Sequence, residues 1–262
     1  MTLPKIIVAP VFQSSNIIKN IIVPPVSKEK AKKASHPPKP VPNFKESLHL
    51  LHMDFCGPMR VKSINRKRYV LVIVDDYSRY TWVQFLRSKD EALEVIKTFL
   101  KKITVLLRAS VIIASFVRTP QQNEFIECRT RTLVEVARTM LIFSCALLFL
   151  WADAIATACY TQNRSIIHRR FNKTPYELIN GRKPDISFLH VFEALCYPKN
   201  NRRDLGKLGA KGDIGFFIGY STNSYAYKVY NRRTKKIMET MNVTFDELLA
   251  MDFEQRNSKP RL

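Results

Sequence analysis

The sequence predicts a mixed α/β fold in which a sheet covered by helices is followed by a smaller region built of strands. Three observations support this prediction. Strand-like segments come in succession between residues 48 and 86, long helical patterns occupy 121–164, and short strand-like segments return after Pro184. Consecutive strands that give way to helices open both α+β and α/β sheets, so the pattern predicts a mixed sheet without deciding between the two classes.

The region 48–86 contains three predicted strands. The first, 48–55, is a short apolar run with Asp54 near its end. The second, 69–74 (YVLVIV), is a continuous run of β-branched and aromatic residues, which is typical of a strand buried on both faces. The third, 80–86, alternates apolar and polar residues. The polar and basic stretch between the first two strands predicts a hairpin connection.

Helical patterns follow the third strand. Residues 88–100 begin with carboxylates, which interact favourably with the dipole of a first helical turn, and continue with apolar residues at helical spacing. Two longer helices are predicted at 121–143 and 149–164. Before them lie two short apolar segments, 103–107 and 111–116, which almost touch in sequence.

The two ends of the chain differ from its middle. Residues 1–46 combine many prolines with a lysine cluster. Because prolines at this density block helix formation and remove backbone donors, we expect an extended basic arm there. Towards the other end, short strand-like segments predict a small β-barrel or meander: 191–197, 214–220, 225–230 and 236–245.

The charge balance points to a polyanionic partner. The chain has 43 lysines and arginines against 22 aspartates and glutamates, a formal net charge of +21. Such an excess favours nucleic acid over a membrane surface, although a basic ribosomal or chromatin protein has the same balance. No apolar run reaches the roughly 18 residues that a bilayer-spanning helix needs, so we expect no membrane segment. The five cysteines form no C-x-x-C pair and fit a reducing compartment.

An ordered set of motifs resembles the integrases of copia-type LTR retrotransposons. The motifs lie at 52–59 (HMDFCGPM), 74–82 (VDDYSRYTW), 85–92 (FLRSKDEA), 119–123 (TPQQN), 172–178 (NKTPYEL), 181–184 (GRKP), 190–192 (HVF) and 216–221 (FFIGYS). Each motif alone is weakly specific. Together they follow the family order over about residues 34–247, and this ordered set is highly specific. The chain resembles an internally deleted fragment of a Pol polyprotein.

This resemblance implies a domain organisation and a partner. Residues 1–46 correspond to a remnant of the pre-integrase region, 47–182 to a truncated integrase catalytic core with an RNase H-like fold, and 188–249 to a small SH3-like β domain. The implied partner is DNA, the implied place of action is the nucleus, and a homo-oligomer is an open expectation. We expect neither a secretory nor a transmembrane signal.

The resemblance also implies a metal-dependent chemistry. Enzymes of this family cut and join phosphodiester bonds with two divalent ions, held by two aspartates and a glutamate. Mg²⁺ prefers such carboxylate oxygens. Asp54 matches the first aspartate of the family and Glu127 matches its glutamate, so the resemblance gives both residues a catalytic and metal-binding role.

The second aspartate of the family is missing from this chain. The family carries it at the end of a fourth strand, in an Arg-Ser-Asp-x-Gly-like motif. Here 106–108 resembles the approach to that motif, and 111–116 already resembles a strand that lies well downstream. No aspartate occurs between Asp90 and Asp153. We therefore predict a deletion of part of the fourth-strand and helix region, and a polynucleotidyl transferase that is inactive.

Other carboxylates are poorer candidates for the vacant role. Asp90 belongs to a helix start, and Asp75 and Asp76 end the second strand, where a turn or an ion pair is the favoured role. The deletion also leaves no room for the crossover of about a dozen residues that joins parallel neighbouring strands. The segments 103–107 and 111–116 are therefore expected to merge into one strand, or one of them is expected to leave the sheet.

Two further departures from the family concern zinc and the approach of DNA. A zinc module that ends in a C-x-x-C pair usually precedes the core, but 26–32 contains no cysteine. A closed structural zinc site needs four ligands, so we expect no zinc. Glu124 stands where the family prefers glycine, and its side chain and charge are expected to hinder the approach of a DNA phosphate.

DNA affinity is expected to survive these losses. Basic residues that flank the first strand or recur along the 121–143 helix are candidate phosphate contacts: Lys62, Arg66, Lys67, Arg68, Arg129, Arg131 and Arg138. Three functions stay open. The chain is a DNA-binding integrase derivative with little or no catalysis, an active strand transferase or endonuclease with a substitute carboxylate, or an unfolded relic of a transposable element.

Overall fold

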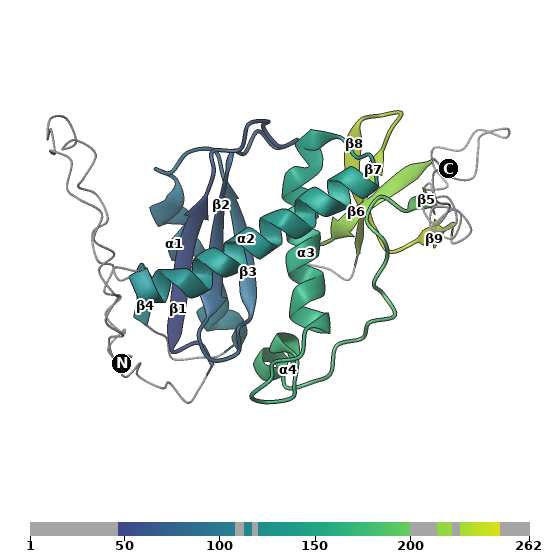
Figure 1. Ribbon diagram of the computed structural model, residues 1–262. Coiled ribbons are helices and arrows are strands. Elements are labelled where there is room, and N and C mark those ends of the chain that lie inside the picture. Colours follow the sequence, from purple (N-terminus) through teal and green to yellow (C-terminus); the bar gives the residue numbers. More distant parts are fainter. Residues whose placement is uncertain (1–46, 108–112, 117–119, 200–213, 222–225, 247–262) are drawn as a thin grey trace, which may run out of the picture.

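The computed structural model describes residues 47–107, 113–116, 120–199, 214–221 and 226–246. The predicted arm, 1–46, and the segment 26–32 lie outside the described residues. Among the described residues the strands form two open sheets, and helix α3 (Trp151–Ser165) lies between them (Figure 1). No helix within the described ranges combines the length and the apolar character that a bilayer crossing requires.

The first sheet has the strand order β3-β2-β1-β4. Its first three strands are β1 (Leu50–Cys56), β2 (Tyr69–Asp75) and β3 (Thr81–Leu86), each antiparallel to its neighbour. The fourth, β4 (Ile113–Phe116), runs parallel to β1. The prediction of three consecutive strands is thus confirmed, and so is the burial of the second strand on both faces, since six of its seven residues are buried.

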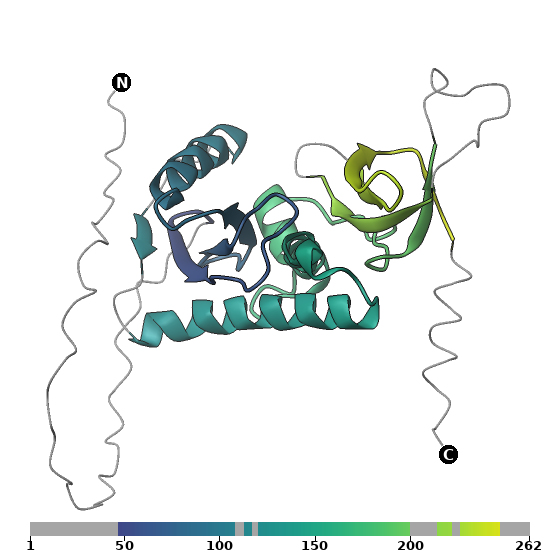
Figure 2. The ribbon, with the colours of Figure 1, turned by 90° about the horizontal axis from the view of Figure 1, so that it is seen from above.

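Helices cover both faces of this sheet (Figure 2). Successive side chains of a strand point to opposite faces, so β2 contributes to two separate layers. Leu71 and Ile73 pack with helix α1 (Ala92–Leu107), whereas Val72 and Val74 pack with helix α2 (Pro120–Phe143) and α3. On β1, Leu51 and Met53 share the α1 layer; consequently Asp54, the next residue, is on the α2 side.

The two apolar segments around the missing motif take different roles. Residues 103–107 form the last turn and a half of α1, with Ile103 buried in the same layer as Phe99 and Leu100. Residues 113–116 form β4 beside β1. Of the two expected outcomes, the departure of one segment from the sheet is therefore the one observed. The physical reason is that Ile103 continues the helical spacing of the apolar face.

The second sheet is antiparallel, with the order β8-β7-β6-β5-β9. Its strands are β5 (Leu195–Pro198), β6 (Gly215–Tyr220), β7 (Tyr227–Asn231), β8 (Lys236–Thr240) and β9 (Val243–Phe245). The predicted strand 236–245 is divided into β8 and β9, and β9 returns to pair with β5. The sheet is an open meander with one returning strand, not a closed barrel.

Helix α3 joins the two sheets. On one side the Asn163 amide donates to the backbone oxygen of Thr81 in β3, over 2.7 Å. On the other side the Thr157 hydroxyl contacts the backbone oxygen of Ile218 in β6, over 3.0 Å. A 3₁₀ turn (Leu148–Leu150) leads into α3, and the short helix α4 (Pro175–Asn180) follows it with a capping box from Thr174.

Candidate metal and nucleic-acid site

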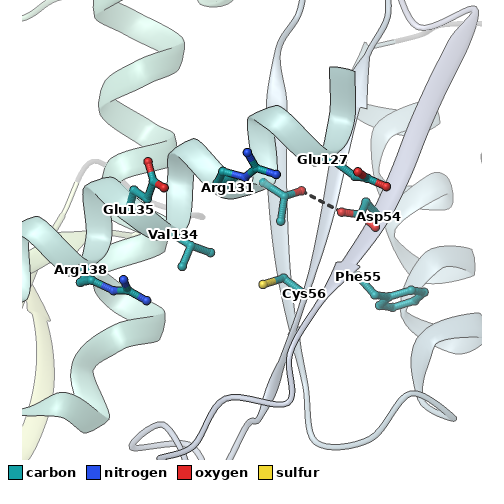
Figure 3. Close-up of a pocket in the computed structure, with 9 residues that line it drawn as sticks. Asp54, Phe55, Cys56, Glu127, Arg131, Val134, Glu135 and Arg138 are labelled. Carbon is teal, nitrogen blue, oxygen red and sulfur yellow. Dashed lines mark hydrogen bonds between the residues drawn. The ribbon is translucent and has the colours of Figure 1, made fainter. Parts of the chain in front are cut away.

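A pocket opens between strand β1 and helix α2 (Figure 3). Its volume is about 380 Å³. Three consecutive residues of β1 form one wall and six residues of α2 the other: Asp54, Phe55, Cys56, Glu127, Thr130, Arg131, Val134, Glu135 and Arg138. The pocket therefore brings together the two carboxylates that the sequence resemblance marks, Asp54 and Glu127.

The position of Glu127 follows from the phase of helix α2. Ile126 and Leu133 are almost fully buried against the sheet and fix which face of the helix meets it. Glu127 comes next to Ile126 on the exposed side, and residues at helical intervals from it share its face. Figure 3 shows the Glu127 carboxylate at the same end of the pocket as Asp54.

Asp54 is held by a side chain that sequence reasoning did not identify. The Thr130 hydroxyl donates to Asp54 Oδ2 over 3.1 Å, the dashed line in Figure 3. Thr130 is 6% exposed and lies one turn after Glu127 on the same helix. Its contact with Asp54 joins residues 76 positions apart in sequence. In the sequence, the only sign of a role for Thr130 is its spacing of three residues from Glu127, and this spacing does not identify Asp54 as its partner.

The pocket contains a third carboxylate, but at a distance from the first two. Glu135 lies eight residues after Glu127, which corresponds to about 12 Å along a helix axis. Figure 3 shows it at the opposite end of the pocket from Asp54, pointing away. Within the described parts of the chain, no group of three or more histidine, cysteine, aspartate or glutamate side chains converges closely enough to hold a metal ion.

The other acidic residues near the sheet have local partners. The buried Asp75 carboxylate accepts hydrogen bonds from the Leu48 and Ser78 backbone N–H groups and from the Ser78 hydroxyl. Burial raises the pKa of Asp75 above its ordinary value. Asp76 contacts His52 Nε2 at 3.0 Å and Arg79 at 3.6 Å. Both aspartates thus have the turn and ion-pair roles that were favoured for them.

Asp90 is not part of the pocket. It lies two residues before the start of helix α1, which covers the opposite face of the sheet from α2. Cys56 does line the pocket, and burial, with a smaller contribution from the charge of Asp54, raises the pKa of its thiol. The Cys56 side chain is therefore a neutral thiol at neutral pH.

Strand β4 occupies the sheet position beside Asp54. Its last residue, Phe116, pairs with Met53, one residue before Asp54. According to the sequence resemblance, the second aspartate belongs at the end of a fourth strand, whereas 111–116 resembles a strand that lies further downstream in the family. Here the chain contains no aspartate from Glu91 to Ala152.

The predicted phosphate-binding residues differ in exposure. Four of them are exposed: Arg131 and Arg138, which line the pocket, and Lys62 and Arg66, which lie in the β1–β2 connection. Lys67 and Arg68, in the same connection, are half-buried, and the Lys67 ammonium pairs with Glu91 at 3.3 Å.

Arg129 points away from the pocket. Its Nε donates to Thr81 Oγ1 over 3.1 Å, and burial lowers the pKa of its guanidinium. Arg129 lies three residues after Ile126, so the helical spacing already places it beside the buried face. A structural role in joining α2 to β3 accounts for its position.

Comparison with known proteins gives a consistent result. The family profile described as "Retroviral polymerase SH3-like domain" matches residues 194–259. The chain is 27% identical over 226 residues to the "Retrovirus-related Pol polyprotein from transposon TNT 1-94" of Nicotiana tabacum, covering 76% of this chain and 17% of that protein. It is also 27% identical over 213 residues to the "Retrovirus-related Pol polyprotein from transposon RE1" of Arabidopsis thaliana, covering 71% of this chain and 14% of the relative.

A similar solved structure is the HTLV-2 integrase catalytic core domain in complex with magnesium. The likeness has a TM-score of 0.36 at 19% identity and covers 52% of this chain and 98% of that one. The chain spans less than a fifth of the length of the two plant polyproteins. Its sequence relatives are Pol polyproteins of copia-type transposons, and its second sheet lies in the SH3-like match. Together, the family match and the two sequence relatives support a retrotransposon integrase fragment.

Proposed function

We propose that this integrase-derived chain binds DNA and is defective in strand transfer. The observation that carries the proposal is the composition of the pocket between β1 and α2. Two of the three family carboxylates, Asp54 and Glu127, lie at one end of it, and two exposed arginines, Arg131 and Arg138, line the remainder. The site thus combines an incomplete acidic cluster with groups that bind phosphate.

The acidic end fits one divalent cation better than two. Asp54 and Glu127 offer the hard oxygen donors that Mg²⁺ prefers, and they would hold the ion between strand and helix. When bound, such an ion supplies Lewis-acid stabilisation of charge on phosphate oxygens. A two-ion arrangement needs at least one shared carboxylate and further ligands. The third family carboxylate would be one of these ligands, and without it the second ion lacks a ligand. We therefore expect weak cation binding and little or no catalysis.

The basic residues supply the proposed DNA affinity. Arg131 and Arg138 recur on the face of α2 that carries Glu127, so a phosphate backbone laid along the helix meets both. Lys62 and Arg66 extend the positive surface at the β1–β2 connection. Contacts of this kind release counterions and are largely independent of base sequence. The proposed place of action is the nucleus, where the DNA lies.

A titration of linear duplex DNA tests the binding part of the proposal. Fluorescence anisotropy over a series of salt concentrations, in EDTA, gives the affinity and its salt slope. Replacing both Arg131 and Arg138 by alanine is expected to lower the slope by about two, roughly one for each arginine that no longer meets a phosphate. The matched control replaces Lys89 and Lys101, which are exposed beside or on α1, and removes the same charge from the other face. Equal effects of the two double substitutions would refute a DNA contact at the pocket.

A cleavage and strand-transfer assay tests the catalytic part. The chain is incubated with linear DNA and Mg²⁺ or Mn²⁺, alongside Asp54→Asn. We expect no metal-dependent product from either protein. Product from the unmodified chain that disappears in Asp54→Asn would establish the alternative, an active enzyme with a substitute carboxylate. A non-cooperative thermal melt of the unmodified chain would establish the other alternative, an unfolded relic.

The same proposal assigns a role to each segment of the chain. Residues 47–182 act as the truncated core that carries the pocket, and 188–249 act as the SH3-like domain. The region 1–46 acts as a basic arm that adds unspecific phosphate contacts. Self-association of the chain, a further expectation, is testable by sedimentation at several protein concentrations.

A further inference from the structure

We infer that Thr130 is a positioning residue that sets Asp54 and Glu127 in one cation-binding arrangement. This inference rests on the proposed function, because it concerns the same acidic end of the pocket. Asp54 and Glu127 belong to different elements, strand β1 and helix α2, so their relative position depends on how the helix is seated on the sheet. The Thr130 hydroxyl makes a direct polar link between these two elements, by its bond to Asp54 Oδ2.

The position of Thr130 on the helix suits this role. It follows Glu127 by three residues, and residues at this spacing are neighbours on a helix surface. It precedes Leu133 by three, and Leu133 is 1% exposed in the core. Thr130 therefore stands at the border between the buried face of α2 and the pocket. A shift of the helix along β1 would break the 3.1 Å hydrogen bond to Asp54 and move Glu127 at the same time.

The hydrogen bond also orients the Asp54 carboxylate. It engages Oδ2, and no described residue engages Oδ1 through a contact seen in the structure. A carboxylate fixed through one oxygen presents the other in a defined direction, whereas a free carboxylate rotates about its last side-chain bond. Partners that orient a metal ligand in this way commonly change metal affinity by about 10–100-fold when they are removed.

The hydroxyl of Thr130 differs from those of the other threonines along α2. Thr132 and Thr139 donate to helix carbonyl groups four residues earlier, those of Cys128 and Glu135, and both side chains are exposed. Such bonds stay within the helix and do not reach the sheet. Thr132 thus provides a matched control on the same helix.

The test measures Mn²⁺ binding by the full chain, from the electron paramagnetic resonance signal of the free ion. Thr130→Val keeps the shape of the side chain and removes the donor, whereas Thr130→Ser keeps the donor. We expect Thr130→Val to weaken Mn²⁺ binding by about tenfold or more, with Thr130→Ser and Thr132→Val close to the unmodified chain. Asp54→Asn serves to assign the bound ion and is expected to abolish this binding. Thermal melts in EDTA verify that each variant is folded.

Three outcomes would overturn the inference. They are equal Mn²⁺ affinity in Thr130→Val and the unmodified chain, a loss in Thr130→Ser as large as in Thr130→Val, and no Asp54-dependent Mn²⁺ uptake by the unmodified chain. The DNA titration in EDTA is independent of all three, because it contains no divalent ion. A failure of the Thr130 inference is therefore distinguishable from a failure of the proposed DNA binding.

Discussion

Replacing Gly219 by alanine tests the packing of strand β6 against helix α3. Gly219 has φ +145, a backbone conformation that L side chains rarely adopt. A Cβ atom built there would lie 2.5 Å from the Thr157 hydroxyl oxygen. That hydroxyl is buried and contacts the backbone oxygens of Asp153 and Ile218. The extra carbon therefore meets a buried hydroxyl that is already held by two contacts.

The expected cost has two parts. A residue other than glycine held in such a backbone region costs about 1–3 kcal/mol. Forcing an additional carbon into a packed site costs about 1–3 kcal/mol more. We therefore expect Gly219→Ala to lower the free energy of unfolding by about 2–6 kcal/mol. This loss is a large fraction of the roughly 5–15 kcal/mol typical of a folded protein.

Guanidinium unfolding followed by circular dichroism measures this loss in the free energy of unfolding. Two further variants separate its backbone part from its steric part. Gly181 has φ +70 and nothing within 4 Å of a built Cβ, so Gly181→Ala is expected to show a left-handed backbone cost without a steric part, about 1–2 kcal/mol. The effect of Gly219→Ala is then measured again in a Thr157→Ala background, where the steric part should vanish. The reasoning fails if Gly219→Ala costs no more than Gly181→Ala, or if Thr157→Ala leaves its cost unchanged.

Two further predictions concern the first sheet. Leu71→Ala, at a side chain that is 0% exposed between β2 and α1, should cost about 2–5 kcal/mol in guanidinium unfolding; Val105→Ala, at a side chain that is 78% exposed, should stay within about 0.5 kcal/mol. Asp76 has a pKa below its ordinary value of 3.8, chiefly because of its hydrogen bond with His52, so its ionised form stabilises the fold. This contribution is present above pH 3.8 and is lost as the pH falls through the lowered pKa. Asp76→Asn should accordingly lose more stability at pH 7 than at pH 3, whereas the loss in Leu71→Ala should not follow this trend. Equal losses in Asp76→Asn at both pH values would contradict the stabilisation of the ionised Asp76 carboxylate by His52 and Arg79.

The elements of the first sheet were predictable because their patterns are local. The continuous apolar run of β2 and the alternation in β3 each specify a strand without reference to the rest of the chain. The segment 103–107 was harder, because a short apolar run fits a strand and a buried helix equally well. What decided its structure is that Ile103 falls on the same helical face as Phe99 and Leu100, so that the helix buries one more side chain by continuing.

The candidate site was predictable only in part. The motifs around Asp54 and Glu127 pointed to a shared pocket, and both residues line it. The hydrogen bond from Thr130 to Asp54 was beyond sequence reasoning, because it depends on how a helix is seated on a strand 76 residues earlier. The opposite orientations of Arg129 and Arg131 were available from the sequence, since two residues apart on a helix means roughly opposite sides.

Helix α3 makes the two sheets inseparable. A single hydrophobic core contains Val72 of the first sheet, Ile155 and Ala158 of α3, and Ile218 and Tyr230 of the second sheet. A fragment cut after residue 182 would expose the side of α3 that now packs on β6 and would lack the partners of that shared core. Truncation to the proposed core alone should therefore give an aggregation-prone product, and the boundary between the two functional segments is not a boundary between two independently folding units.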